Sequence, residues 1–185
     1  MALPRSRRLL AATIVAAAAA LSPTQAANAG PPAPTVPPEI AVEAGHKLFL
    51  VGHAAGVQIY KCNAATAGYS WSFAGPRAEL YDDNGKLITT HFGGPTWQAT
   101  DGSTAKGTLV RPAPVDPTAI PWLLLSAKGT PGADGDRLAG TTFIQRIATT
   151  GGLMPPAGEC HAGTAGTVDE VPYTADYYFW KATGA

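Results

Sequence analysis

Charged residues are scarce in this sequence. They make up 14% of the 185 residues, and the formal net charge at pH 7 is zero. Coiled coils and disordered chains need a higher charged fraction, and nucleic-acid binding needs a basic surface. With 45% hydrophobic residues, the composition instead favours a compact globular protein.

The sequence also lacks any stretch of ten or more residues with a convincing helical period. Its 21 glycines and 17 prolines interrupt helices and supply turns. Period-two alternation is common: Tyr69–Phe73 alternates aromatic residues with serine, and Tyr173–Lys181 places Tyr173, Ala175, Tyr177 and Phe179 on one face. We therefore predict an all-β, single-domain antiparallel β-sandwich or β-barrel with few or no helices.

Eight or nine short strands are expected at regular spacing. Residues 47–53 and 56–62 are predicted to form a first hairpin, joined by Ala54-Ala55. Asn84-Gly85 is predicted to form a type I′ turn between strands 78–81 and 86–92, because this dipeptide accepts the positive φ angles that the turn requires.

The N-terminus has the pattern of a secretory signal peptide. Arg5, Arg7 and Arg8 precede an apolar run over residues 9–21, and Ala27-Asn28-Ala29 fits a cleavage site. A transmembrane helix is the alternative, but it requires about 20 apolar residues, more than this run contains. A twin-arginine signal is a second alternative that the residues after the arginine pair fit only in part. We predict a signal peptide over residues 1–29 and a secreted, periplasmic or cell-envelope location.

The remaining chain divides into a proline-rich leader over residues 30–46 and a single β domain over residues 47–185. GPPAPTVPP at residues 30–38 is expected to be extended and to act as a spacer or a strap. Without the three signal arginines, ten basic residues face 13 acidic ones, for a net charge of −3. This charge predicts no nucleic-acid partner and no attraction to anionic membranes, and the sequence contains no transmembrane segment.

Cys62 and Cys160 are the only cysteines. An even cysteine count in an exported chain favours a disulfide between them. The alternative is a reactive Cys160 thiolate beside His161, which would need a free thiol in an oxidising compartment.

Several separated motifs together resemble one protein family. They are Gly56–Cys62 (GVQIYKC), Trp71 with Pro76–Leu80, His91 with Gly94–Trp97 (GPTW), Asp101–Ser103 (DGS), Ile120–Leu124 (IPWLL), Ile144–Arg146 (IQR) with Thr150–Gly152 (TGG), and Tyr173-x-Ala-x-Tyr177. The chain from about Leu48 to Trp180 resembles the DUF3455 family of secreted bacterial and fungal proteins of unknown function. The resemblance implies export, one domain and the Cys62–Cys160 pairing, and it assigns no catalytic residue.

His91, Trp97 and Asp101 are the candidate binding residues. The Gly93-Gly94-Pro95 break and the Asp101-Gly102 turn bracket the short strand that carries Trp97, so we expect the three side chains to surround one concavity. An ordinary turn at Asp101 and a core position for Trp97 are the alternatives.

No cofactor or metal is predicted. His53, His91 and His161 with Asp101 offer ligand chemistry, but no two histidines have a metal-site spacing. Hydrolase and nucleotide-binding motifs are also missing. The sequence favours an exported domain that binds a small molecule, a glycan or a partner outside the cytoplasm. The alternative is an enzyme, with or without the help of a metal, whose uncharacterised site is centred on His91, so enzymatic activity stays open.

Overall fold

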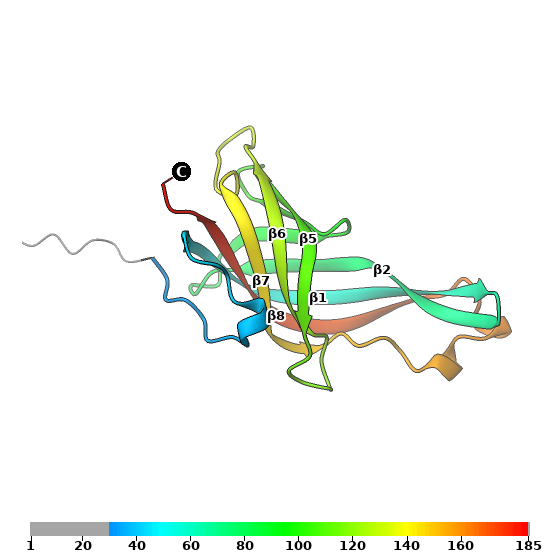
Figure 1. The fold of residues 1–185 in the computed structure, drawn as a ribbon. Helices are drawn as coiled ribbons and strands as arrows, with labels where there is room; N and C mark the ends of the chain where they lie inside the picture. The colour runs from blue at the N-terminus through cyan, green and yellow to red at the C-terminus, as the bar shows by residue number, and fades with distance from the viewer. Residues whose placement is uncertain (1–29, 185) are drawn as a thin grey trace, which may run out of the picture.

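The computed structural model describes residues 30–184, which form a closed antiparallel β-barrel (Figure 1). Each strand pairs with the next in the chain, and β8 pairs with β1 to close the barrel. This confirms the all-β prediction and selects the barrel over the sandwich. The predicted signal peptide, residues 1–29, lies outside the described residues. The strands are β1 (His46–Ala65), β2 (Gly68–Tyr81), β3 (Leu87–Phe92), β4 (Thr96–Ala99), β5 (Thr104–Ala113), β6 (Trp122–Thr130), β7 (Thr141–Gly151) and β8 (Val168–Ala182).

Helical structure between residues 30 and 184 is confined to three short 3-10 helices. These are η1 (Pro38–Ile40), η2 (Ala157–Glu159) and η3 (Ala162–Thr164). None of the helices in this part of the chain has the length and apolar character needed to cross a membrane.

The barrel interior is filled by side chains that alternate along the strands. On β8, Tyr173, Ala175, Tyr177 and Phe179 share one face of the strand, as predicted, and the structure shows that this face points inward, with each residue at most 3% exposed. They pack against small and branched residues from the other strands, including Ala54, Leu80, Ile88 and Ile144. Small residues at several of these positions let the strands curve tightly around the interior.

The predicted first hairpin is wrong, because residues 46–65 form one continuous strand. Ala54 and Ala55 lie within its ladders, where Ala54 pairs with Leu80 on β2 and with Ala175 on β8. Neither alanine has a positive φ angle, so nothing at this point reverses the chain. The next residue, Gly56, marks a close approach of strands, since a Cβ atom there would overlap the Arg77 carbonyl oxygen.

The turn between β2 and β3 also differs from the prediction. Gly85 has a φ of 75°, but Asn84 does not have the positive φ that a type I′ turn requires. The Asp82 carboxylate instead accepts hydrogen bonds from the backbone N–H groups of Asn84 and Lys86, each at 2.9 Å. Asp82 therefore stabilises a different turn, with glycine supplying its single left-handed residue.

Strands β1, β2 and β8 continue beyond one end of the barrel as a three-stranded arm (Figure 1). The segment that enters β8 runs back along this arm, and its Cys160 forms a disulfide with Cys62 on β1, with Cα atoms 5.4 Å apart. The predicted pairing is confirmed. Trp71 on β2 donates a hydrogen bond to the Pro156 carbonyl at 3.2 Å, which ties the same segment to the arm.

The proline-rich leader packs against the outer surface of the barrel. Ile40 is fully buried against Leu124 and Ile147, which point outward from β6 and β7. Gln145 donates to the Ile40 carbonyl at 2.7 Å and accepts a hydrogen bond from Trp180 at 2.9 Å. The leader thus acts as a strap over β6, β7 and β8.

Candidate functional site

A cavity of about 310 Å³ enters the barrel at the end that bears the arm. Because every strand contributes to its wall, the cavity is the lumen of the barrel and not a surface groove. The lining includes one residue or more from each strand; in order from β1 to β8, examples are Gln58, Pro76, His91, Trp97, Leu109, Leu125, Arg146 and Tyr177.

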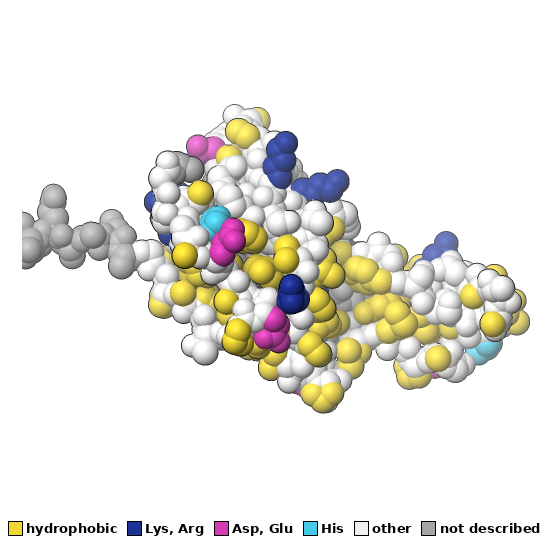
Figure 2. Space-filling view, in the orientation of Figure 1, with side chains coloured by type: hydrophobic (Ala, Val, Ile, Leu, Met, Phe, Trp, Pro, Cys, Tyr) yellow, Lys and Arg dark blue, Asp and Glu magenta, His cyan; other side chains and the backbone are white. Residues whose placement is uncertain are grey.

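The walls of the cavity are mainly apolar. Leu123 and Leu125 on β6 line one side, and Phe73 and Leu109 stand at the mouth, where they are 53% and 55% exposed. Hydrophobic side chains continue from the barrel body onto the arm (Figure 2). The arm base, residues 73–76, therefore forms one lip of the opening.

His91 and Trp97 are cross-strand neighbours on β3 and β4 and stack face to face in this lumen. Their ring centroids are 4.1 Å apart and their planes differ by 7°. His91 is 4% exposed and Trp97 is 1% exposed, and Tyr177 meets both rings edge-on. The turn at residues 93–95, which the sequence marks with two glycines and a proline, brings the two strands together.

The imidazole of His91 is neutral. Burial lowers its pKa from 6.5 to about 3, and the positive charge of Arg146 acts in the same direction, while the hydrogen bond to Thr96 opposes both. The Nδ1–H group donates to the Thr96 carbonyl at 2.9 Å. Nε2 is therefore an unprotonated acceptor in a largely apolar cavity.

Two buried tyrosines lie beside this pair. The hydroxyl oxygens of Tyr173 and Tyr177 are 3.2 Å apart, and burial raises the pKa of both groups. Arg146 lowers both pKa values against that effect, so its charge acts across the lumen. The nearby Gln58 amide also lowers the pKa of the Tyr173 hydroxyl. Its Nε2 atom nevertheless has no partner with hydrogen-bond geometry among residues 30–184.

Asp101 lies at the opposite end of the barrel and does not line this cavity. Its carboxylate accepts hydrogen bonds from the Ser103 hydroxyl at 2.6 Å and from the Arg137 backbone N–H at 2.9 Å, and these bonds lower its pKa. It thereby joins the β4–β5 turn to the β6–β7 loop. The structure brings His91 and Trp97 together, and Asp101 belongs to a structural turn.

Three polar residues of the lumen, Gln58, Arg146 and Tyr177, were not among the residues predicted from sequence. Arg146 had a visible signal, because a single charge within the β-branched run 141–148 faces either solvent or a site. Tyr177 was placed on one strand face with Tyr173, Ala175 and Phe179, without a role. Gln58 carries no signal that separates it from an ordinary strand residue.

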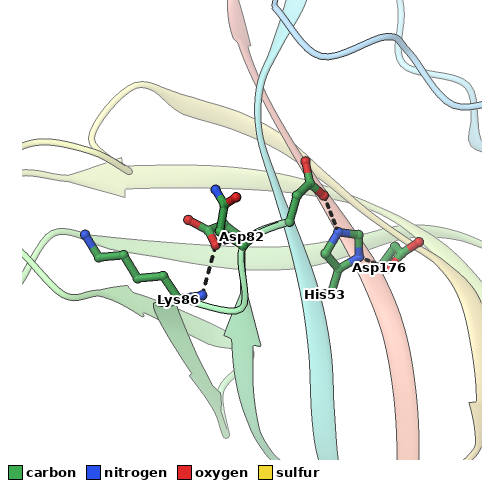
Figure 3. Close-up of polar contacts among 6 residues, drawn as sticks. His53, Asp82, Lys86 and Asp176 are labelled. Atoms are coloured by element: carbon green, nitrogen blue, oxygen red, sulfur yellow. Dashed lines mark hydrogen bonds and ion pairs between the residues drawn. The ribbon is translucent and has the colours of Figure 1, made fainter.

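A second polar group lies on the outer surface around His53 (Figure 3). His53 Nε2 is 2.8 Å from Asp83 and Nδ1 is 2.7 Å from Asp176, and these bonds, Asp83 first, raise the pKa of His53. The carboxylates flank opposite ring nitrogens, so they hold the imidazole and do not converge on one point. Across residues 30–184, no three His, Cys, Asp or Glu side chains are grouped so that they could hold a metal ion.

Acidification should destabilise the protein through His91. The unfolded chain takes up a proton below pH 6.5, whereas folded His91 stays neutral until about pH 3. Its stabilising contribution is complete above pH 6.5 and is lost as the pH falls, by about 1.4 kcal/mol per pH unit. We expect about 2 kcal/mol less stability from this residue at pH 5 than at pH 7.

Urea unfolding of the wild type and of His91→Asn at both pH values measures this effect. Asparagine keeps a side-chain donor for Thr96 but does not titrate, so the variant should lose less stability between pH 7 and pH 5. Leu80→Ala is the control: it removes a buried side chain that does not titrate, so it should keep the wild-type pH dependence. Equal pH dependence in His91→Asn and the wild type would show that His91 protonates without cost.

Comparison with known proteins gives a family but no relative of known activity. Residues 43–181 match the family described as a protein of unknown function, DUF3455. No curated protein and no solved structure matches the chain.

Proposed function

Since the chain belongs to the DUF3455 family, whose description assigns no activity, we propose from its own cavity that it binds a small, mainly apolar molecule inside the barrel. The lumen of about 310 Å³, lined by all eight strands, is the observation that supports this function. Ligand pockets have volumes of about 300–1,000 Å³, apolar walls and a few polar groups that orient the ligand. A lumen at the lower end of this range suits a compact molecule better than a glycan chain or a protein segment.

The chemistry of His91 supports binding more than catalysis. A general base works best when its pKa is close to the working pH, and the pKa of His91 is about 3. Nε2 can accept a hydrogen bond from a ligand but takes up a proton poorly at neutral pH. The stack of His91 on Trp97 offers a rigid, flat surface of the kind that planar groups contact.

We also propose that binding occurs outside the cytoplasm. The disulfide between Cys62 and Cys160 supports this location, because disulfides persist mainly in oxidising compartments. The signal-peptide pattern of residues 1–29 points the same way.

The neutral dye N-phenyl-1-naphthylamine tests the proposed function, because its fluorescence rises in an apolar site. Leu123 is only partly buried and lines the cavity, so Leu123→Trp can occupy the lumen without overpacking the core. We expect the wild type to bind the dye and Leu123→Trp to bind it at least about tenfold more weakly, which corresponds to about 1.4 kcal/mol. Fluorescence titration gives both dissociation constants.

Leu153→Trp is the matched control. Leu153 is 41% exposed and does not line the cavity, so this variant should bind the dye like the wild type. Circular dichroism should show the same fold for all three proteins. Equal affinity of Leu123→Trp and the wild type would place the dye outside the lumen and reject the proposed function.

A further inference from the structure

Among residues 30–184, no carboxylate pairs with the buried positive charge of Arg146. Arg146 is 9% exposed, on β7, and pairs in register with Leu123 on β6 and Tyr177 on β8, two residues that line the cavity. The ion pairs among residues 30–184 join His53 to Asp83, His53 to Asp176 and Arg77 to Glu170. None of them includes Arg146.

Within residues 30–184, the hydrogen-bond partners of Arg146 are neutral: its guanidinium donates to a backbone carbonyl and also toward the Tyr177 hydroxyl, which lowers the pKa of that hydroxyl. Nη2 and Nε both donate to one backbone oxygen, the carbonyl of Pro121, at 2.7 and 3.3 Å. A guanidinium carries five N–H donors and keeps its charge at any physiological pH. A buried charge is costly unless it is paired, so a counter-ion in the lumen would remove a penalty that the free protein carries.

Other groups around the lumen add to an excess of donors. Gln58 Nε2 and Trp97 Nε1 are buried and have no hydrogen-bond partner within the described part of the chain. Gln58 is 3% exposed, and both residues line the same cavity as Arg146. His91 Nε2 and the Tyr177 hydroxyl oxygen can accept hydrogen bonds, but neither carries the negative charge that would balance the guanidinium. The lumen therefore favours a ligand group that only accepts hydrogen bonds.

We propose that the ligand of this barrel is a small apolar carboxylic acid, whose carboxylate binds Arg146 with help from the Gln58 amide and whose apolar part contacts the leucines and the His91–Trp97 stack. A carboxylate matches both requirements, since it carries the missing negative charge and has acceptor oxygens only. Arg146 contributes a fork of donors that suits bidentate pairing. This inference rests on the proposed function and specifies the class of molecule.

Competition between two isosteric probes tests the charge requirement. The anion 2-naphthoate and the neutral 2-naphthamide each displace bound N-phenyl-1-naphthylamine at pH 7.5. In the wild type we expect 2-naphthoate to bind about tenfold to a hundredfold more tightly, the range of a hydrogen-bonded charge pair. In Arg146→Met this preference should vanish, because methionine offers no positive charge that distinguishes the anion from the neutral amide.

Arg111→Met is the matched control, because Arg111 on β5 is exposed and does not line the cavity. This variant should keep the full preference for 2-naphthoate. Dye binding with equal displacement by both probes in the wild type would overturn the carboxylate proposal and leave the proposed function standing. Failure of the wild type to bind the dye and both probes would reject both. The wild-type comparison decides the matter even if Arg146→Met does not fold.

Discussion

Replacing Trp97 by alanine should lower the free energy of unfolding by about 3–5 kcal/mol and also abolish binding of N-phenyl-1-naphthylamine. Trp97 is 1% exposed and packs against His91, Tyr177 and Phe179, with ring centroids 4.1, 5.4 and 6.2 Å away. Its removal leaves a void in the interior and takes away the flat wall of the lumen. Urea unfolding measures the first effect and dye titration measures the second.

Leu80→Ala separates the two effects of the Trp97 variant. Leu80 is fully buried in the same core but does not line the cavity, so this variant should lose about 2–5 kcal/mol and still bind the dye. Trp97→Phe keeps an aromatic ring against His91 and should lose less stability than Trp97→Ala. If Trp97→Ala and Leu80→Ala lower the affinity for the dye equally, the loss reflects general destabilisation. Trp97 is then a core residue without a binding role.

Trp97 belongs both to the core and to the wall of the cavity, a combination that its sequence context does not reveal. From the sequence, a core position and a binding position for Trp97 are alternatives, because core residues are expected in the interior and binding residues at the surface. In a closed barrel the inward-facing side chains belong to the interior and also line the cavity, so a residue can be buried at 1% exposure and still contact a ligand. The stacking of His91 on Trp97 follows from their cross-strand register, which the short turn at residues 93–95 sets.

Local patterns predicted the class of fold but not its closure. The alternation in β8 correctly grouped the residues of one face, because side-chain direction has a strict period of two along a strand, but it did not say which face is inward. Pairing of β8 with β1 joins residues more than 100 positions apart, such as His53 and Asp176, and no local signal specifies it. Closure into a barrel therefore had to come from the structure.

The position of Asp101 was predictable in principle. Asp101 lies four positions after Trp97, in the turn that follows the end of β4 at Ala99. Successive turns of an up-and-down barrel lie at alternate ends, so the turn before β4 and the turn after it face opposite ways. Once the barrel is known, the 93–95 turn and the 101–103 turn belong to different ends of it. Asp101 is therefore expected at the end opposite the cavity mouth.

The disulfide should be the other large contributor to stability. The bond joins residues 98 positions apart and encloses the strands from β2 to β7 in one covalent loop. Closing a loop of about 100 residues restricts the unfolded chain by up to about 4.7 kcal/mol in the chain-entropy model. We expect the double variant Cys62→Ala, Cys160→Ala to lose about 2–5 kcal/mol in urea unfolding, because the constraint acts on the unfolded state of the whole domain.

Hydrogen exchange distinguishes this global effect from simple fraying of the arm. Cys62 keeps its backbone hydrogen bonds to Thr167 and Gly166 whether or not the sulfur atoms are joined, so the arm retains part of its structure in the variant. Protection should fall for barrel amides as well as for arm amides, since global unfolding becomes easier for both. Faster exchange confined to residues near 57–75 and 152–172, with an unchanged urea midpoint, would mean that the disulfide stabilises only the arm. That outcome would also show that the lumen can be built without the covalent loop, so dye affinity in the double variant should then equal that of the wild type.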